Sequence, residues 1–280
     1  MYLKKYRILV LSIMTIAIMI IFTSNPIINL NKGTGLIGNI IKQSEQSNNE
    51  KKSKDSKVND NSTKEKENDS QKEILICIDP GHQEKGDRRP EQVAPGSGQT
   101  KARVSSGATG VSTKKPEYIL NLEASMVLKH ILEGKGYNIV MTRESHNVNI
   151  SNAERAQLAN DKNAKMVIRI HADSISNPSK TGASILIPAK DGKYTTSIYE
   201  ESSKCANLVQ EKMKNDGINI NGIFERNDLT GFNWSKVPVI LIEMGFLSNH
   251  SEDQMMSNPE YQRKLMQSVA DGVEEYFLTN

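Results

Sequence analysis

Apolar residues after residue 73 form short continuous runs that are separated by longer mixed stretches. Continuous apolar runs of this length are typical of strands buried on both faces. They predict strands over 74–78, 138–142, 166–170, 183–187 and 237–242. The stretches between the runs carry apolar stripes or helix-start signals, and they predict helices that begin at Pro116, Ser151, Ser197 and Pro259. This alternation predicts a single α/β domain, with a mostly parallel twisted sheet flanked by helices on both faces.

The N-terminal residues carry a different pattern. Residues 8–22 are almost entirely apolar and follow three basic residues, which is typical of a signal peptide or a signal-anchor. The run is shorter than the about 20 residues that a spanning helix needs, but extension through Leu30 would supply the missing length. No small-x-small cleavage site follows the run, which favours an uncleaved membrane segment over 1–30. The basic residues then place the rest of the chain on the extracytoplasmic side, either membrane-anchored or secreted.

Residues 31–73 separate this segment from the predicted domain. Within 42–73 the only strongly apolar side chain is Val58, and the remainder is polar or charged. Such a composition cannot bury enough apolar surface to offset the entropy lost on ordering. We therefore predict a disordered polar linker over 31–73 and a folded domain over 74–280.

The charge balance excludes one class of partner. The chain has 280 residues and a formal net charge of +3. The surplus lies in residues 1–41, which hold four basic residues and no acidic one, so the folded part has no global field that attracts nucleic acid. Two cysteines are too few for a disulfide scaffold or a Cys-rich zinc cluster. We expect no nucleic acid partner.

Three predicted strands run directly into polar residues that can ligate a metal or move a proton. His82 follows the first strand, His171 the third and Glu243 the last. Because the carboxyl ends of parallel strands meet at one edge of a sheet, these side chains should converge there, near Glu117 in the first turn of a helix. Two imidazoles and a carboxylate form the donor set of a hydrolytic zinc site, and a further carboxylate could move the proton.

The same residues also have structural interpretations. A histidine at a strand end is often only a hydrogen-bonded structural residue, and Glu117 could stabilise its helix through the helix dipole. A carboxylate at Glu243 would be costly to bury without a partner, which favours a functional role. Asp79 and Asp173 lie close in sequence to the two histidines and could orient their rings.

Seven short motifs follow one another in a fixed order within 74–278. They are residues 76–82 (ICIDPGH), 107–110 (GATG), 117–122 (EYILNL), 142–143 (TR), 155–160 (RAQLAN), 168–173 (IRIHAD) and 238–249 (PVILIEMGFLSN). As an ordered set they resemble the type-3 family of zinc-dependent N-acetylmuramoyl-L-alanine amidases. The resemblance implies that the substrate is peptidoglycan. The bond cleaved, by zinc-activated water, would be the amide that joins the lactyl group of N-acetylmuramic acid to the L-alanine of the stem peptide.

The resemblance also implies roles for individual residues. It assigns Zn²⁺ to His82, Glu117 and His171, and it makes Glu243 the catalytic carboxylate. Glu117 is preferred to the nearby Glu123 because the ligand of the family lies four residues before an Asn-Leu pair.

The connection between the first two ligands departs from the family pattern. Gln83 stands where the family has a glycine, and the path to Glu117 is longer than usual. Residues 84–112 are rich in Gly, Ser, Pro and charge with little periodicity, and they predict a long loop. The insertion over 84–106 could shape a substrate cleft, bind a partner or form a solvated surface loop.

Several functional alternatives stay open. The amidase could act in wall turnover or in modification of the spore cortex during sporulation or germination, and a regulatory protein partner could control zinc loading. A non-catalytic peptidoglycan-binding or adaptor domain on the same fold is the first alternative. A zinc peptidase that cuts within the stem peptide is the second.

Overall fold

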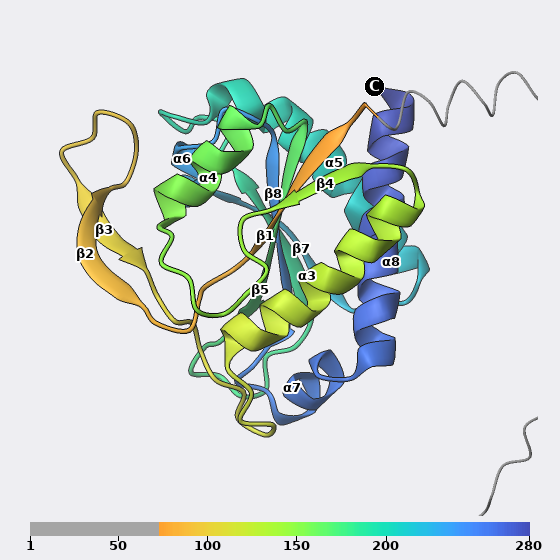
Figure 1. Cartoon of the computed structure of the whole chain (residues 1–280). Helices are drawn as coiled ribbons and strands as arrows, with labels where there is room; N and C mark the ends of the chain where they lie inside the picture. The colour runs from red at the N-terminus through yellow and green to blue at the C-terminus, as the bar shows by residue number, and fades with distance from the viewer. Residues whose placement is uncertain (1–72) are drawn as a thin grey trace, which may run out of the picture. The chain divides into compact units, whose positions relative to one another are not determined.

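The computed structural model describes residues 73–280, so the membrane segment predicted over 1–30 and almost all of the linker predicted over 31–73 lie outside the described residues. Within 73–280, the helices are all too short or too polar to cross a membrane. The elements follow in the order β1 (Leu75–Pro80), β2 (Asp87–Gln92), β3 (Thr100–Val104), α3 (Glu117–Gly134), β4 (Asn138–Met141), α4 (Asn152–Asp161), β5 (Met166–Asp173), β6 (Ala183–Pro188), α5 (Thr196–Asn215), β7 (Ile220–Arg226), α6 (Thr230–Asn233), β8 (Val239–Phe246), α7 (His250–Met256) and α8 (Pro259–Thr279) (Figure 1).

Six of the strands form one sheet in the order β4-β1-β5-β8-β6-β7. Neighbouring strands run parallel, except that β6 and β8 are antiparallel. The mostly parallel α/β sheet that the sequence predicts is confirmed. β1, β5 and β8, whose ends carry the candidate residues, are direct neighbours near the middle of the sheet.

Alternate residues along each central strand contribute to two separate cores. In β1, Ile76 and Ile78 join the core formed with α3, α5 and α8, whereas Cys77 joins the core formed with α4 and α6. Both cores are apolar, so each central strand is a continuous apolar run in the sequence. In β5, Val167 belongs to the α4–α6 core, and Arg169 and His171 continue along the same face of the strand towards its carboxyl end.

The start of α4 at Ser151 confirms the predicted beginning of this helix. The Ser151 hydroxyl accepts a hydrogen bond from the Glu154 backbone N–H, and the Glu154 carboxylate accepts one from the Ser151 N–H. This reciprocal pair is the capping box that the sequence predicts.

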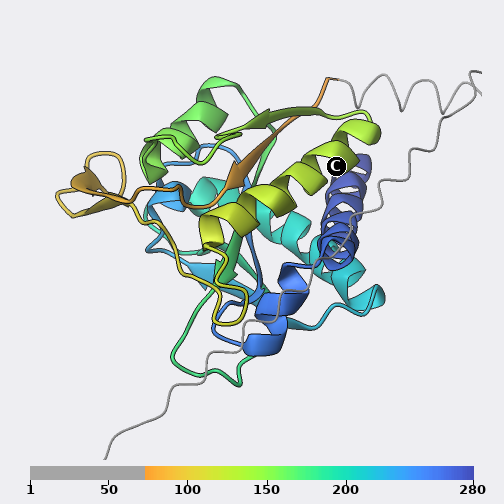
Figure 2. The same cartoon turned by 60° about the horizontal axis from the view of Figure 1, so that its bottom comes forward.

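The long loop predicted over 84–112 is wrong in part, because β2 and β3 form an antiparallel hairpin in this stretch. Figures 1 and 2 both show the hairpin projecting away from the central sheet. Side chains of the domain hold both ends of the hairpin: Asn152 Nδ2 donates to the Arg103 carbonyl near its base (2.8 Å), and Trp234 Nε1 donates to the Gln92 carbonyl beside its loop (2.8 Å). The two strands are mainly polar and exposed, so they carry no apolar alternation that would predict them.

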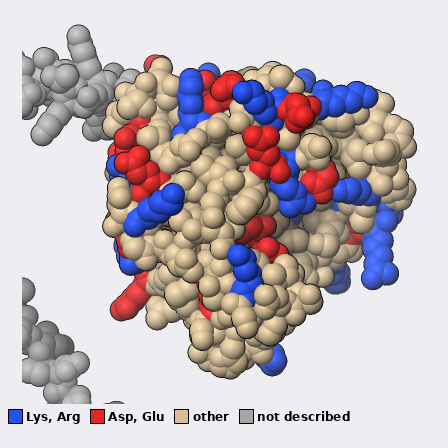
Figure 3. Space-filling model, turned by 180° about the vertical axis from the view of Figure 1, so that it is seen from behind, with Lys and Arg blue, Asp and Glu red and all other residues tan. Residues whose placement is uncertain are grey.

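Charged side chains are mixed on the face shown in Figure 3, where Lys and Arg lie beside Asp and Glu. Examples of such close pairs among the described residues are Arg89 with Asp87, Lys135 with Asp271 and Arg226 with Asp228. Mixing of this kind leaves the face without a field of a single sign.

Candidate metal centre

The carboxyl ends of β1, β5 and β8 bring the predicted residues to one edge of the sheet. His171 lies directly opposite Glu243 in the register of β5 and β8. The Gly81 N–H donates to the Ile170 carbonyl at 2.9 Å, so His82 begins where β1 leaves the sheet beside β5. Glu117 reaches the same place from the first turn of α3. The structure therefore brings all four sequence-predicted residues to one region.

The three candidate ligands form a compact group. One donor atom from each of His82, Glu117 and His171 lies within 4.8 Å of the others. Glu117 Oε1 is 3.0 Å from His82 Nε2 and 3.3 Å from His171 Nδ1. The two imidazole rings are 4.8 Å apart between centroids and meet edge to face at 78°. Among the described residues, this is the group of His, Cys, Asp or Glu side chains that could hold a metal ion.

The chemistry of the group fits a divalent ion of the zinc type. Two imidazole nitrogens and one carboxylate oxygen are the protein ligands of many hydrolytic zinc sites, which leave a position open for water or substrate. Burial lowers the pKa of His171 to about 4, despite its hydrogen bond to Glu117, so its ring is neutral at pH 7 as a ligand must be. The ring also carries a buried Nε2 atom without a hydrogen-bond partner.

Hydrogen bonds fix the carboxylate of Glu117. Its Oε2 accepts from the Ala108 N–H at 2.9 Å, and its Oε1 accepts from Asn121 Nδ2 at 3.2 Å and from the Ala172 N–H at 3.3 Å. Burial opposes ionisation of this group, but the contacts with His171 and His82 outweigh it and hold the pKa of Glu117 well below its usual range. Asn121 belongs to the Asn-Leu pair by which the family pattern distinguishes Glu117 from Glu123. Residues four positions apart share a helix face, so the side chain of Asn121 can donate to Glu117.

The ring of His82 is oriented by the end of the hairpin. Its Nδ1 lies 3.1 Å from the Ser105 carbonyl and 2.9 Å from the Ser105 hydroxyl. With a metal ion bound, a proton on Nδ1 that is donated to this carbonyl would leave the lone pair of Nε2 free to ligate the ion. His82 itself has a φ of 62°, and its carbonyl accepts from Arg155 Nη2 at 2.9 Å.

Two glycines leave room for the ligands. A Cβ atom at Gly81 would lie 2.3 Å from Cε1 of His171, which is far inside contact distance. At Gly107, where φ is +81°, a Cβ atom would lie 2.6 Å from Oε2 of Glu117. The Asp-Pro-Gly-His and Gly-Ala-Thr-Gly motifs therefore place backbone against the candidate ligands where a side chain would displace them.

Glu243 lies in the same pocket but is not one of the three grouped donors. A cavity of about 240 Å³ is lined by His82, His171 and Glu243, together with residues of the hairpin and α6. The Oε2 atom of Glu243 is buried without a hydrogen-bond partner. Burial raises the pKa of Glu243 well above its usual range, and the neighbouring charges of Glu117 and Asp173 raise it further. Such a free carboxyl oxygen is suited to taking up and releasing a proton.

Asp79 does not have the role that its position in sequence suggested. Its carboxylate accepts from Arg155 Nη1 at 2.7 Å, Arg169 Nε at 2.8 Å and the Thr142 hydroxyl at 2.5 Å, and not from a histidine ring. Burial opposes ionisation of Asp79, but the two guanidinium groups hold its pKa well below its usual range. Asp173 accepts from the N–H of Ser174 rather than from either candidate histidine. Among residues 73–280, neither carboxylate therefore orients a candidate histidine ligand.

Arg143 ties the first strand to the start of α3, a role that sequence reasoning missed. It donates to the carbonyls of Pro80 (2.9 Å), Gly81 (2.9 Å) and Tyr118 (2.8 Å). Burial, with a contribution from the charge of Arg155, lowers the pKa of Arg143 to about 10, so it stays charged at neutral pH. The signal in the sequence was the Thr142–Arg143 motif, but its contacts with a strand and a helix depend on the tertiary fold.

Comparison with known proteins identifies the family. A family model described as N-acetylmuramoyl-L-alanine amidase matches residues 76–275. An N-acetylmuramoyl-L-alanine amidase of Mycobacterium tuberculosis is 26% identical over 214 residues, which cover 74% of this chain and 87% of that protein. The germination-specific N-acetylmuramoyl-L-alanine amidase of Bacillus subtilis is 29% identical over 187 residues, which cover 60% of this chain and 73% of that protein.

Solved structures share the fold. The amidase Ami1 of Mycobacterium smegmatis has a TM-score of 0.66 at 23% identity, covering 74% of this chain and 98% of that one. An N-acetylmuramoyl-L-alanine amidase of Clostridium difficile has a TM-score of 0.59 at 26% identity, covering 74% of this chain and 98% of that one. Since the family model spans well over half of the sequence and includes every residue of the candidate centre, the chain belongs to the N-acetylmuramoyl-L-alanine amidase family and is an enzyme of that class.

Proposed function

We propose that this chain is a zinc-dependent peptidoglycan hydrolase that cleaves the amide between the lactyl group of N-acetylmuramic acid and L-alanine of the stem peptide. The observation that carries the proposal is the convergence of His82, Glu117 and His171, with the unpaired carboxyl oxygen of Glu243 in the same pocket. Family membership supplies the bond and the substrate class.

In this proposal the three grouped residues hold the ion and Glu243 moves the proton. A bound Zn²⁺ ion supplies Lewis-acid activation of the scissile carbonyl and lowers the pKa of water to about 7. Glu243 Oε2 takes a proton from the attacking water and delivers it to the alanine nitrogen as the carbon–nitrogen bond breaks. The products are a lactyl carboxylate on the glycan and a peptide with a free N-terminal alanine.

The positions of the surrounding groups support these roles. Glu117 is held by two backbone N–H groups and one side-chain amide, so its carboxylate is fixed before any ion arrives. A positive ion beside Glu243 would favour its ionised form, which opposes the effect of burial and brings the pKa towards the range that a proton shuttle needs.

The two alternatives are less well supported. A binding or adaptor domain has no need for a buried carboxyl oxygen without a partner, because such a group is costly to keep. A peptidase would need the same ion and proton shuttle, and the difference would lie in which amide reaches them. The family match favours the amide next to muramic acid.

The proposal extends to location and biological role. Residues 1–30 would anchor or export the chain, and residues 31–73 would act as a tether to the extracytoplasmic domain. The similarity to a germination-specific amidase supports a role in the spore cortex, with wall turnover as the alternative. The CwlD amidase of Clostridioides difficile has been solved in complex with the GerS lipoprotein, and it has a TM-score of 0.59 to this chain at 22% identity. We include a regulatory protein partner in the proposal on that basis.

Mass spectrometry of digested peptidoglycan tests the bond. The purified full chain should release peptides with N-terminal alanine and leave glycan with free lactyl groups. Glu243→Gln should retain bound zinc and abolish this release, whereas Glu144→Gln, an exposed surface change, should leave it intact. Fragments cut within the peptide or within the glycan would contradict the proposed activity.

A further inference from the structure

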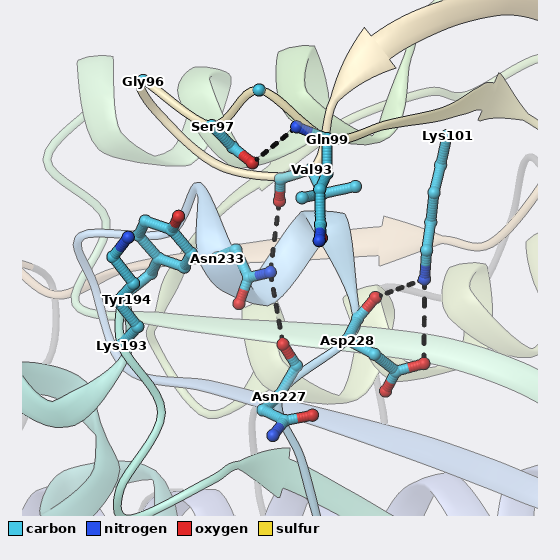
Figure 4. Close-up of a pocket in the computed structure, with 11 residues that line it drawn as sticks. Val93, Gly96, Ser97, Gln99, Lys101, Lys193, Tyr194, Asn227, Asp228 and Asn233 are labelled. Carbon is cyan, nitrogen blue, oxygen red and sulfur yellow. Dashed lines mark hydrogen bonds and ion pairs between the residues drawn. The ribbon is translucent and has the colours of Figure 1, made fainter.

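A second pocket lies beside the candidate active site (Figure 4). Its volume of about 560 Å³ is within the range of about 300–1,000 Å³ that is typical of small-molecule sites. One wall is the loop between β2 and β3, and the other walls are the residues before α5, the turn after β7 and Asn233 of α6. We propose that this pocket is a subsite for the glycan strand and takes an uncharged N-acetylated sugar next to the muramic residue. The proposal rests on the proposed function.

The two pockets are adjacent. Lys101 and Asp228 line both of them. Lys101 Nζ donates to the Asp228 carbonyl at 2.7 Å and lies 3.7 Å from the Asp228 carboxylate. In the proposal, a polymer whose lactyl group lies at the candidate metal centre passes this exposed pair to reach the second pocket.

The second pocket is preformed. The buried Asn233 side chain donates to the carbonyls of Val93 (3.1 Å) and Asn227 (3.4 Å), which joins two walls. The loop closes on itself, because the Val93 N–H donates to the Gln99 carbonyl (3.0 Å) and the Gln99 N–H donates to the Ser97 hydroxyl (3.1 Å). A site held in this way needs little ordering when a ligand binds.

The lining suits a sugar. Within residues 73–280, the side-chain amides of Gln99 and Asn227 make no hydrogen bond, and they lie on opposite walls of the pocket in Figure 4. Amides donate and accept, as the hydroxyl and N-acetyl groups of a sugar require. The half-buried ring of Tyr194 at the side of the pocket offers an apolar surface to the carbon–hydrogen face of a pyranose, and a hydroxyl at its tip.

The same lining argues against the stem peptide as the occupant. Stem peptides carry carboxylates, which are bound best by cations that are not already neutralised. Lys101 is paired with Asp228, and that carboxylate also accepts from Arg226 at 2.7 Å and 2.9 Å. The other lysine of the pocket, Lys193, is exposed and lies over the Tyr194 ring, 5.2 Å from its centroid. Lys101, which also lines the cavity at the candidate metal centre, is therefore not free to bind a carboxylate, and this favours an uncharged ligand on that side of the pocket.

The proposal gives a function to the insertion over 84–106. The insertion forms the hairpin, and its loop supplies Val93, Ser97 and Gln99 to the pocket. The polar, exposed strands then serve to carry this loop to the side of the active site and hold it there.

Ligand-observed NMR titration of the full chain with tetra-N-acetylchitotetraose tests the subsite without zinc or hydrolysis. Wild-type protein should bind this uncharged β-1,4-linked oligosaccharide. Gln99→Ala and Asn227→Ala should each weaken binding about three- to tenfold, as expected for the loss of one or two hydrogen bonds. The matched variant Asn207→Ala, on the exposed side of α5, should bind as wild type does. Gln99 is exposed, so its loss should not unfold the domain.

Several results would overturn the subsite. The subsite is wrong if the chitotetraose does not bind to wild-type protein, or if it binds to both pocket variants as tightly as to wild type. If the same two variants instead weaken the binding of a stem tripeptide without sugar, the pocket binds the peptide and not the glycan. Hydrolysis of muramyl dipeptide by the wild-type chain tests the proposed function separately. If that hydrolysis fails while the pocket variants still weaken sugar binding, the proposed function fails and the sugar site stands.

Discussion

Replacing Asp79 by asparagine tests the buried charge network beneath the candidate centre. Asp79 is 1% exposed and is the carboxylate partner of Arg155 and Arg169, which are 2% and 6% exposed. Asparagine keeps the shape but leaves two buried guanidinium groups without a negative charge. Removing one member of a buried ion pair typically costs about 3–5 kcal/mol, because the remaining charge is uncompensated. We expect Asp79→Asn to lower the free energy of unfolding by about this amount.

Urea denaturation followed by circular dichroism measures the loss. The free energy of unfolding of a domain of this size falls by roughly 2–3 kcal/mol per M of urea, so the urea concentration at the unfolding midpoint should fall by roughly 1–2.5 M. Asp161→Asn, at the exposed end of α4, is the matched control and should change stability by no more than about 0.5 kcal/mol. A loss of less than about 1 kcal/mol in Asp79→Asn would show that the two arginines do not need this carboxylate.

Three further predictions concern pH, the ligands and a helix cap. Because the pKa of Asp79 is lower in the folded than in the unfolded chain, its carboxylate contributes fully to stability above the unfolded pKa of about 3.9. The difference in free energy of unfolding between wild type and Asp79→Asn should therefore narrow as the pH falls below about 4. A difference that stays constant from pH 7 to 2 would contradict this. Gly81→Ala should weaken zinc binding about 10- to 100-fold in a chelator competition, because the new Cβ displaces the His171 ring; wild-type affinity would show that the ring can move freely. Ser151→Ala should cost about 0.5–2 kcal/mol in urea denaturation by removing the cap of α4, and an unchanged midpoint would show that the cap contributes nothing.

The positions of the candidate residues could be predicted from the sequence because each follows an apolar run. A run buried on both faces marks a central strand, and parallel neighbours end at the same edge. The structure places His82, His171 and Glu243 at that edge, as predicted. Glu117 was a candidate from its place in the first turn of a helix, but the choice of Glu117 over Glu123 came from the family resemblance.

The hairpin could not be predicted because its strands are polar on both faces. It is stabilised by contacts with distant residues, such as the bond from Trp234 to Gln92, and these are invisible along the chain. The strand β7 was missed for a related reason: it is an edge strand with a mixed pattern and a glycine at φ +145°. β4, the strand at the other edge of the sheet, was predicted because it keeps the short apolar run that β7 lacks.

The partners of Asp79 were also beyond sequence reasoning. Proximity in sequence suggested that it orients His82, but its carboxylate bonds to Arg155 and Arg169, which are 76 and 90 residues away. Which cation meets a buried carboxylate depends on strand order and on the path of α4. The sequence establishes only that a charge at a strand end needs a partner.

Anomalous X-ray diffraction at the zinc absorption edge, on crystals grown with zinc, would locate the bound ion. We predict one strong peak per chain, about 2.0–2.2 Å from a nitrogen of His82, a nitrogen of His171 and a carboxylate oxygen of Glu117. Glu243 should lie near the peak without touching it. A peak at another cluster of side chains, or no peak between these three, would contradict the account.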